Sequence, residues 1–325
     1  MPTVHFVNVS PGDCSIIQHA SGRATIIDIC DGYYDASVSV DLLRHYREQR
    51  RMTEAPTNPL AYAANRLGLT EFWRFVLTHP DMDHMDGLDA LFENFTVQNF
   101  WDTGAKREKP SFDEGTAYVE ADWDRYESLV AGTESGVTVL HPLAGSKFKF
   151  ANRNEDGQGA GDGIYVCSPN AALVKDASDN EDSLNDASYV LCYNSQGGRI
   201  VFPGDAHDKT WEFACSAHAQ MLGSCHVLIA PHHGRHSDRS YDFLNLLKPK
   251  LTLFGSAPYE HQAKAYAQWD KRNLPYISSD EAGTVVMECE SGGIRVFVEN
   301  PSIIPAGSRG QTNAFGYREL FFIPK

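Results

Sequence analysis

The segment Thr78–His84 constrains this chain more than any other. It reads Thr-His-Pro-Asp-Met-Asp-His and follows the apolar run Phe72–Leu77, which predicts a buried strand, whereas residues 85–93 are typical of a helix start. A strand-to-helix turn therefore carries four metal-capable side chains, which are His79, Asp81, Asp83 and His84. Imidazole and carboxylate groups together suit Zn²⁺, Mn²⁺ or Fe, and two cations on such a turn make a hydrolytic site. Helix capping would explain one aspartate, but not the two flanking histidines as well.

Two later strands are predicted to end in the same kind of residue. The apolar run Arg199–Phe202 leads to Gly204-Asp205, and Val227–Ala230 leads to His232 and His233. A carboxylate at a strand end can bridge two metals, although a turn aspartate is an equally ordinary role. Adjacent histidines at a strand end are uncommon as plain structure, so we expect at least one of them to be a ligand.

Three further residues are candidates for substrate contact. Asn185 precedes a strand and either reaches the metals or caps a turn. His261 follows the predicted strand 251–254 and either contacts substrate or begins a helix. Arg235, like Lys209 and Arg239, either neutralises a phosphate at the rim or is an ordinary surface charge.

Composition limits the partners and the compartment. The 325 residues carry 28 basic and 43 acidic side chains, a formal net charge of −15, which disfavours duplex DNA and acidic membranes as partners. The seven cysteines form no CxxC pair and lie mostly in apolar runs, as reduced thiols of a cytoplasmic protein do. We expect no signal peptide and no transmembrane helix, because the chain has neither a basic-then-apolar start nor an apolar window of about 18 residues.

The order of predicted elements indicates one α/β domain. Residues 4–29 predict a β-meander, 36–70 and 104–135 predict helical insertions, and the second half alternates strands and helices. We predict a hairpin from strands 137–140 and 147–150, and polar loops at 152–163 and 175–186. Two sheets packed face to face with helices outside are the simplest arrangement of these elements. The domain is expected to span 1–298, with the tail 299–325 packing on the body.

These motifs together resemble the metallo-β-lactamase-fold hydrolases, whose usual signature is His-x-His-x-Asp-His. The chain is most similar to the branch typified by the hydrolase domain of the competence DNA-uptake channel protein, which often carries His-Pro-Asp-x-Asp-His, as His79–His84 do. The other family segments have counterparts in the family's order, which are Asn8–Asp13, Asp28–Gly32, Asn185–Ser188, Gly204–Asp205 and His232–Gly234.

The resemblance implies an αββα sandwich with two divalent cations at one edge. Its implied metal-site residues are His79, Asp81, Asp83, His84, Asp205 and one histidine of the 232–233 pair. We favour His233, because the family's usual Pro-Gly-His-Gly loop then aligns with Pro231–Gly234. Asp81 replaces a histidine of most relatives, which makes Mn²⁺ credible beside Zn²⁺. Asn185 stands where many relatives have another histidine, so we expect one of the two metals to bind weakly.

The main functional hypothesis is metal-dependent hydrolysis of a phosphodiester, in single-stranded nucleic acid or a small phosphoester. In it, Asp83 and Asp205 are the catalytic residues, which hold the attacking water on the metals. One alternative is an acyl, lactone or amide hydrolase on the same two-metal site. Another is a partner-binding protein whose metal site is structural or regulatory, with the insertions and acidic loops as docking surfaces. The sequence leaves the substrate, the native metal and the oligomeric state open.

Overall fold

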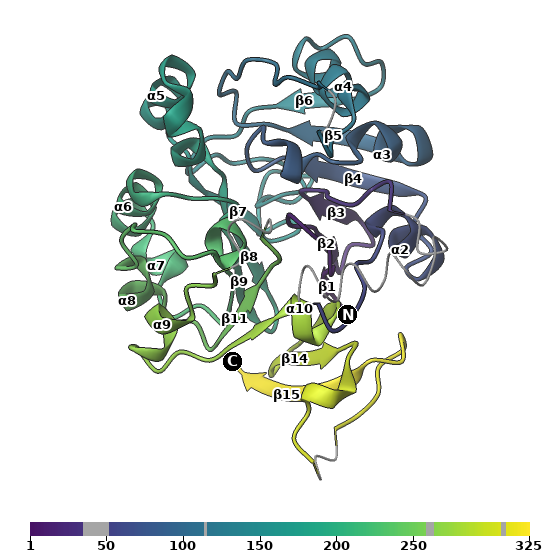
Figure 1. Ribbon diagram of the computed structural model, residues 1–325, viewed down its shortest axis with the longest axis vertical. Coiled ribbons are helices and arrows are strands. Elements are labelled where there is room, and N and C mark those ends of the chain that lie inside the picture. The colour runs from purple at the N-terminus through teal and green to yellow at the C-terminus, as the bar shows by residue number, and fades with distance from the viewer. Residues whose placement is uncertain (35–51, 114–115, 258–262, 307–309) are drawn as a thin grey trace.

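The structure is a computed structural model that describes residues 1–34, 52–113, 116–257, 263–306 and 310–325. Within these ranges the strands form two sheets, one of nine strands and one of six. Figure 1 shows the two sheets side by side in the middle of the molecule, with helices on the outer side of each. This layering confirms the predicted α/β fold class, an αββα sandwich.

The larger sheet has the strand order β15-β14-β13-β1-β2-β3-β4-β5-β6. Its strands are β1 (Thr3–Phe6), β2 (Ser15–Gln18), β3 (Ala24–Ile27), β4 (Glu71–Val76), β5 (Thr96–Trp101), β6 (Thr138–Leu140), β13 (Val285–Glu290), β14 (Gly293–Val298) and β15 (Arg318–Pro324). Strands β1 to β3 form the antiparallel meander, whereas β3, β4, β5 and β6 are parallel to one another. The carboxyl ends of these four parallel strands therefore lie at one edge of the sheet.

The smaller sheet has the order β12-β11-β10-β9-β8-β7. Its strands are β7 (Ile164–Ser168), β8 (Val190–Ser195), β9 (Gly198–Phe202), β10 (Val227–Ile229), β11 (Leu251–Phe254) and β12 (Tyr276–Ser278). Strands β9 to β12 are parallel, so the segments that follow β9 and β10 leave the sheet at the same edge. Those two segments contain the Gly-Asp and His-His motifs.

The helices that the structure describes are short. They are α2 (Pro59–Asn65), α3 (Leu88–Asn94), α4 (Glu120–Val130), α5 (Ala171–Asp179), α6 (Asp208–Ala217), α7 (Ala219–Leu222), α8 (Phe243–Leu247), α9 (Tyr266–Asp270) and α10 (Ser279–Ala282). Figure 1 places α2, α3 and α4 outside the larger sheet and α6, α7, α8 and α9 outside the smaller one. None of the helices in the described ranges is long and apolar enough to span a bilayer.

Three buried apolar clusters hold the layers together. The central cluster lies between the sheets, where Val4 and Val76 of the larger sheet join Leu191 and Ile200 of the smaller one. A second cluster packs α2, α3 and α4 on the larger sheet, and a third packs α6, α8 and α9 on the smaller sheet. Both faces of the parallel strands are therefore covered, as parallel sheets require.

Two predictions about local structure were wrong. Residues 147–150 do not pair with 137–140 as a hairpin, because β6 instead pairs in parallel with β5 and the chain turns back at 148–153. The acidic stretch 175–186 is not a loop but the end of α5 and a 3₁₀ segment, Glu181–Ala187. The Asn170 side chain caps α5 by accepting hydrogen bonds from two backbone N–H groups, and Leu173 and Ala177 give the helix a buried side.

The two predicted insertions are described in part. Within 36–70 the structure has α2, and residues 36–51 lie outside the described ranges. The segment 104–135 contains α4, which packs on α3. At the C-terminus, β15 pairs antiparallel with β14 and forms the edge of the larger sheet.

Candidate metal centre

The predicted strand-to-helix turn brings its four side chains to the edge of the larger sheet. After β4, His79 lies in a bend and Asp81 in extended backbone, and a 3₁₀ turn, Met82–His84, leads to α3. Nε2 of His79 lies 3.3 Å from Oδ2 of Asp81. Both histidines are fully buried, whereas the side chains of Asp81 and Asp83 are 29% and 20% exposed. The turn thus combines sequestered imidazoles with carboxylates that solvent reaches.

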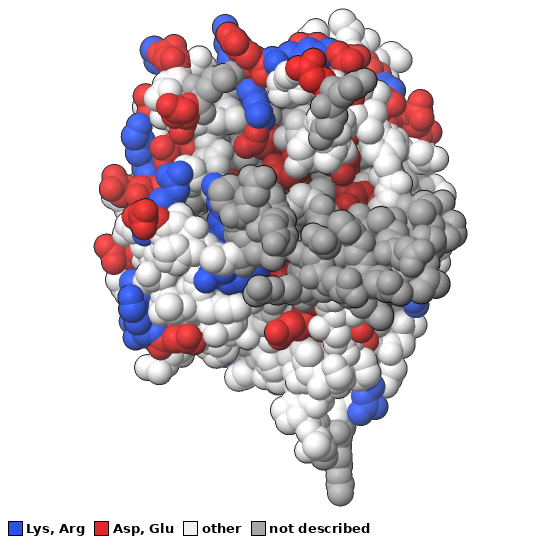
Figure 2. Space-filling view, in the orientation of Figure 1, with Lys and Arg blue, Asp and Glu red and all other residues white. Residues whose placement is uncertain are grey.

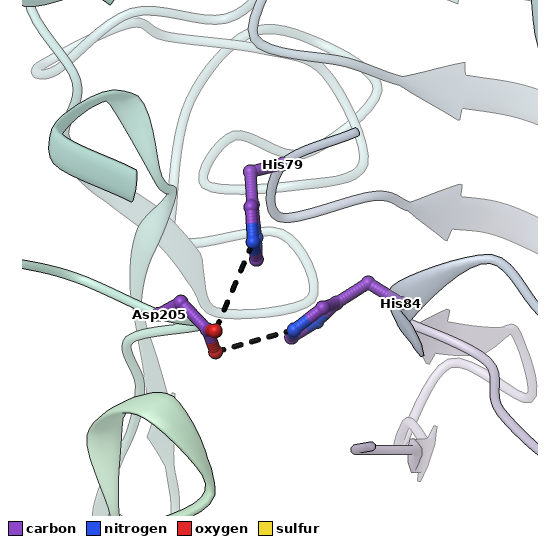
Figure 3. Close-up of side chains that lie close together, drawn as sticks. All are labelled: His79, His84 and Asp205. Carbon is purple, nitrogen blue, oxygen red and sulfur yellow. Dashed lines mark ion pairs between the residues drawn. The ribbon is translucent and has the colours of Figure 1, made fainter. Parts of the chain in front are cut away.

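Asp205 faces this turn from the smaller sheet. It follows β9 directly, and its side chain is 3% exposed. The residue before it, Gly204, has φ +51°, and a Cβ there would lie 2.6 Å from Cβ of Thr78. A glycine is therefore required for the two sheets to approach at this point. Figure 3 shows His79 and His84 pointing at Asp205 across the gap between the sheets.

His232 and His233 both turn toward Asp205. Both adopt left-handed backbone, with φ of 54° and 56°, and Gly234 follows at φ 75°. Left-handed backbone costs about 1–2 kcal/mol for each non-glycine residue, and such strain is concentrated at functional sites. This backbone lets two adjacent side chains face one centre. The sequence analysis favoured His233 alone, whereas in the structure both His232 and His233 lie close to Asp205.

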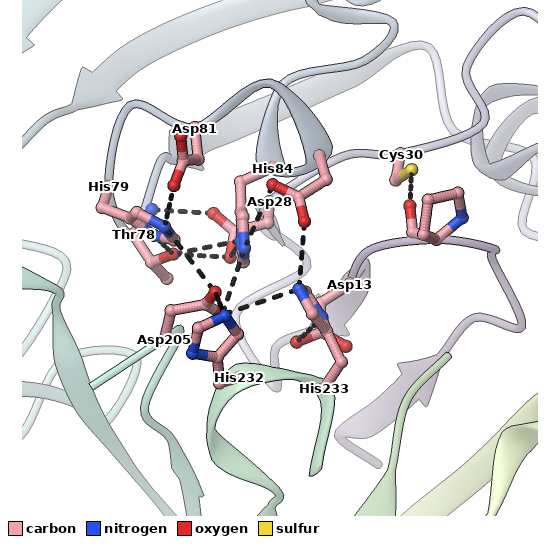
Figure 4. A network of polar contacts seen from close by, with 12 residues as sticks. Asp13, Asp28, Cys30, Thr78, His79, Asp81, His84, Asp205, His232 and His233 are labelled. Carbon is pink, nitrogen blue, oxygen red and sulfur yellow. Dashed lines mark hydrogen bonds and ion pairs between the residues drawn. The ribbon is translucent and has the colours of Figure 1, made fainter. Parts of the chain in front are cut away.

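The two oxygens of Asp205 face two different groups of side chains (Figure 4). Oδ1 lies 3.2 Å from Nε2 of His84 and 3.7 Å from Nε2 of His233. Oδ2 lies 3.1 Å from Nε2 of His232 and 3.9 Å from Nε2 of His79. The Asp205 carboxylate therefore stands between two groups of imidazoles.

One further carboxylate accompanies each group. Asp83 lies on the first side, with Oδ2 3.2 Å from Nε2 of His233 and Oδ1 3.9 Å from Nε2 of His84. Asp81 lies on the second side, next to His79. We call the first group, Asp83, His84 and His233, the inner set. The second group, His79, Asp81 and His232, is called the outer set, and Asp205 is common to both.

Each of the four imidazoles has a polar side chain close to Nδ1, although Nδ1 of His233 makes no hydrogen bond. The Nδ1 atom of His79 lies 3.2 Å from the Thr78 hydroxyl, and that of His84 lies 2.8 Å from Oδ2 of Asp28. On the other motif, Nδ1 of His233 is 3.2 Å from Oδ2 of Asp13, and Nδ1 of His232 is 3.1 Å from Nε2 of His207. Anchoring by the far nitrogen is how proteins orient metal-binding histidines, because it fixes both the ring and its tautomer.

Charge in the inner set is balanced by protons on its imidazoles. Burial alone would lower the pKa of His84, but the carboxylates of Asp205 and Asp28 outweigh it and raise that pKa well above 6.5. Burial opposes protonation of His233 too, yet Asp205 and Asp13 raise its pKa to about 10. The inner set thus attracts positive charge strongly, and a cation bound there would displace these protons.

The outer set differs in its electrostatics. Burial lowers the pKa of His79 to about 4 and that of His232 to about 3, so both imidazoles are neutral at pH 7 and have a lone pair for a metal. Asp205 stays ionised, because the neighbouring histidines outweigh its burial and hold its pKa well below the usual range.

The donor atoms fit a metal. Among the described residues, Nε2 of His79, Nε2 of His84 and Oδ1 of Asp205 are buried and make no hydrogen bond. Leaving such atoms without a partner costs about 1–3 kcal/mol each, so orphaned atoms that face one point indicate a missing ligand. Two of the possible ligand sets in the described chain are His79-His84-Asp205 and Asp83-His84-His233. This mixture of nitrogen and oxygen donors suits Zn²⁺ or Mn²⁺.

The predicted substrate residues lie around the outer set. The amide nitrogen of Asn185 is 3.2 Å from Nε2 of His207, the imidazole that anchors His232. Arg235 directly follows the His-His-Gly turn, is partly buried, and its charge helps to lower the pKa of His232. Lys209 instead forms an ion pair with Asp176 on α5. His261 lies outside the described residues.

Four residues that shape the centre were not among the predicted site residues, although His207 was left possible because it lies close to Asp205 in the sequence. They are the anchors Asp13, Asp28 and His207, and Arg107, whose guanidinium forms an ion pair with Asp81 and donates to the Pro80 carbonyl. Asp13 and Asp28 belong to segments that resemble family motifs, which is the signal that could have found them. Arg107 lies in a segment without a motif, so only the fold reveals it.

Comparisons with known proteins give likenesses among solved structures alone. No model of a protein family matches the chain, and no curated protein matches it. A diphosphatase of the PhnP family is similar at 15% identity, with a TM-score of 0.44 over 89% of this chain and 98% of that one. A metallo-hydrolase from the hyperthermophilic archaeon Ignicoccus hospitalis has 14% identity and a TM-score of 0.48 over 89% and 100% of the two chains. A metal-dependent hydrolase of the β-lactamase superfamily has 14% identity and a TM-score of 0.48, over 89% of this chain and 99% of that one.

At these identities and TM-scores, the similarities do not assign a chemical activity to this chain. The fold described above rests on the strand pairings of this chain, and the candidate centre rests on its own distances. The relation to the competence branch stays a prediction.

Proposed function

We propose that this protein is a metal-dependent hydrolase that cleaves phosphodiesters, either small phosphoesters or single-stranded nucleic acid. One observation carries the proposal. Four buried or nearly buried imidazoles, each with a polar side chain close to Nδ1, direct Nε2 toward the two oxygens of one buried carboxylate, Asp205. Two of these nitrogens, Nε2 of His79 and Nε2 of His84, are buried without a hydrogen bond among the described residues, which a purely structural cluster would not leave so.

Each set holds one divalent cation in this proposal. The inner set offers two imidazole nitrogens and the Asp83 carboxylate, and the outer set offers two imidazole nitrogens and the Asp81 carboxylate. Asp205 contributes one oxygen to each side. The extra carboxylate of Asp81, where a third histidine would be usual, makes the outer set harder and so more favourable for Mn²⁺.

Divalent cations held there supply Lewis acidity toward water and toward a phosphoryl oxygen. The residues of the chain orient the metal-facing imidazoles and accept the proton of the water. Asp28, Asp13 and Thr78 keep the imidazoles in one tautomer and orientation. Asp83 remains a carboxylate at neutral pH, because His84 and His233 outweigh its burial and lower its pKa. Its partly exposed oxygens are the ones that can accept a proton from a water entering the site.

The surface charge limits the substrate. The net charge of −15 disfavours a long duplex. On the face shown in Figure 2, lysine and arginine side chains are mixed with aspartate and glutamate, so an anion does not meet a field of one sign there. Arg107 and Arg235 bring positive charge near the outer set. A small or single-stranded phosphodiester is therefore the substrate that we propose.

The test combines elemental analysis of the protein as isolated with cleavage of bis(4-nitrophenyl) phosphate and of a single-stranded oligonucleotide, with Mn²⁺ or Zn²⁺ added back. We expect metal-dependent cleavage of at least one substrate, lost in Asp205→Asn and kept in Asp156→Asn, a control on an exposed loop. Removal of one oxygen ligand of a two-metal site costs at least about 100-fold in rate. Turnover of thioesters or lactones without phosphodiester cleavage would contradict the proposal.

A further inference from the structure

A large pocket lies beside the candidate metal centre and belongs to none of its ligand sets. Its volume is about 850 Å³, and its walls come from α4, α5 and the segments that follow β5 and β6. Pockets that hold small organic ligands have volumes of about 300–1,000 Å³. In Figure 1 the arrows of β5 and β6 point toward α5, while α4 lies next to β6.

The order of the parallel strands places this pocket at the same sheet edge as the metal turn. Strands β4, β5 and β6 are parallel neighbours, and a polar residue follows each within two positions of its end. These residues are Thr78, Asp102 and His141. Asp102 and His141 line the pocket, and Thr78 precedes the metal-facing His79. Ligands of α/β proteins bind along such carboxyl edges, so one molecule can cover several adjacent strand ends.

Arg107 connects the pocket to the centre. It lines the pocket, and its guanidinium forms an ion pair with Asp81 and donates to the Pro80 carbonyl. Asp81 in turn lies 3.3 Å from Nε2 of His79. The pocket wall is thus two contacts away from a metal-facing imidazole.

The walls are chiefly apolar and aromatic. Trp123 and Tyr126 of α4 stand in contact, with ring centroids 5.3 Å apart, and Val130, Leu143 and Val174 add aliphatic surface. Val130 is 43% exposed at the end of α4, although it is a large apolar side chain. This apolar part of the wall favours a flat hydrocarbon ring, while the basic side chains of Lys106, Arg107 and Lys175 also line the pocket and suit a negative charge.

Two buried polar atoms among the lining residues also need a partner. Within the described part of the chain, Oδ1 of Asp102 and Nε1 of Trp123 make no hydrogen bond, although both residues are at most 1% exposed. The other oxygen of Asp102 accepts from Gly104 N, and the Asp102 backbone carbonyl lies 3.0 Å from Nδ1 of His141. These polar atoms are buried within the wall, so the surface that faces the pocket beside them is left chiefly apolar.

We propose that this pocket binds the aromatic group of a small phosphodiester whose phosphate lies at the metal centre. The inference rests on the proposed function and narrows its substrate class from phosphodiesters in general to aryl phosphodiesters. Arg107 lies between the two ends of such a molecule and faces its negative charge.

The first test measures binding without turnover. Isothermal titration of the protein as purified compares naphthalene-1-phosphonate with methylphosphonate, which share the charged group but not the ring. We expect the naphthyl compound to bind at least about tenfold more tightly, as burial of a ring in an apolar pocket predicts. Val130→Glu, and separately Ala131→Glu, remove this preference by placing a carboxylate at the pocket wall.

Val119→Glu is the matched control for these variants. Val119 lies at the other end of α4, is 42% exposed, and does not line the pocket. It is expected to keep the full preference for the naphthyl compound. Equal affinities in the unmodified protein, or a preference that survives both pocket variants, would overturn the proposal.

The second test separates the pocket from the reaction. With Mn²⁺ or Zn²⁺ added, O,S-dimethyl phosphorothioate and O-(1-naphthyl) S-methyl phosphorothioate have the same leaving group, methanethiol, and only the second ester carries a ring. We expect KM to be about tenfold lower for the naphthyl ester. Turnover of both esters with equal KM would contradict the pocket assignment and support the proposed reaction. Absence of turnover, with the phosphonate preference intact, would contradict the reaction and support the pocket.

Discussion

Oδ2 of Asp28 lies 2.8 Å from Nδ1 of His84, on the side of the imidazole away from Asp205. The same carboxylate accepts hydrogen bonds from the backbone N–H and the hydroxyl of Thr78, both at 2.7 Å. Asp28 is 2% exposed and adopts left-handed backbone at the end of β3, so one buried residue fixes a ring and the start of the metal turn. It acts on the candidate centre through His84 and, by way of Thr78, through His79.

The Asp28→Asn variant should therefore weaken metal binding without removing a ligand. An amide keeps the size of the side chain but loses the negative charge that favours the Nδ1–H tautomer, and loss of such an anchor costs about 10–100-fold in metal affinity. Competition with a chelator of known affinity for Zn²⁺ or Mn²⁺ measures the change. Asp156→Asn should leave the affinity unaltered, and an unchanged affinity in Asp28→Asn would show that the anchor has no effect on binding.

His232 and His233 should serve different cations. His233 faces Asp83 and Oδ1 of Asp205, whereas His232 faces Oδ2 of Asp205. Each single change to alanine is expected to lower the metal content after dialysis by about one ion per chain, and the double change by about two. A His232→Ala protein that keeps its full metal content would show that His232 is not a metal ligand, and the outer set would then lack one of its two imidazoles.

Stability should depend on a buried ion pair far from the metals. Arg74 is 1% exposed, and its guanidinium contacts Oδ2 of Asp162 at 3.1 Å and the Thr25 hydroxyl at 2.9 Å. Asp162→Ala leaves the Arg74 cation buried with two neutral partners, the Thr25 hydroxyl and the Phe150 carbonyl. We therefore expect the free energy of unfolding to fall by about 3–5 kcal/mol. Urea unfolding measures the loss.

Two comparisons keep that result interpretable. Asp156→Ala changes an exposed aspartate of the same loop and should cost less than about 1 kcal/mol. The double variant Arg74→Met/Asp162→Leu removes both buried charges and should recover most of the stability, because Arg23, the other partner of Asp162, is 26% exposed and reaches solvent. If Asp162→Ala lowered the free energy of unfolding by less than about 1 kcal/mol, the ion pair between Arg74 and Asp162 would not be what stabilises the loop 152–163.

Acid sensitivity should come partly from His5. This residue is fully buried beside Tyr62 and Phe315, and burial lowers its pKa to about 4 from the ordinary 6.5. The unfolded chain therefore binds the proton first, and the stability contributed by neutral His5 is present above pH 6.5 and lost as the pH falls toward 4. Between pH 7 and pH 5 this group accounts for about 2 kcal/mol.

The matching experiment is urea unfolding of His5→Gln at both pH values. The variant should show a smaller fall in unfolding free energy between pH 7 and pH 5 than the unmodified protein, by about 2 kcal/mol. His236→Gln, at an exposed position, should retain the full fall. An identical pH dependence in His5→Gln would rule out His5 as the source.

The strand ends could be predicted from sequence because they combine two strong signals. An apolar run predicts a buried strand, and polar residues directly after it must leave the sheet at its edge, as His79, Asp205 and His233 do. The distances among these residues need the pairing order of both sheets, which periodicity does not reveal. The 3.7 Å between His233 and Asp205 is therefore a result of the fold.

Other features left no such signal. His232 and His233 both face Asp205 because both are left-handed, a backbone state that their residue type does not require. Helix α5 has an acidic, polar surface with Leu173 and Ala177 as its buried residues, so its composition resembled a loop. Arg107 reaches Asp81 across 26 positions of sequence, and no local pattern marks that contact.

The central claim is that Asp205 stands between two divalent cations. Anomalous diffraction at the manganese edge from crystals grown with Mn²⁺ tests it most directly. We predict two anomalous peaks, one among Asp83, His84 and His233 and one among His79, Asp81 and His232, with Asp205 within coordination distance of both. Crystals that bind Mn²⁺ elsewhere, or that show no peak within reach of Asp205, would contradict the account.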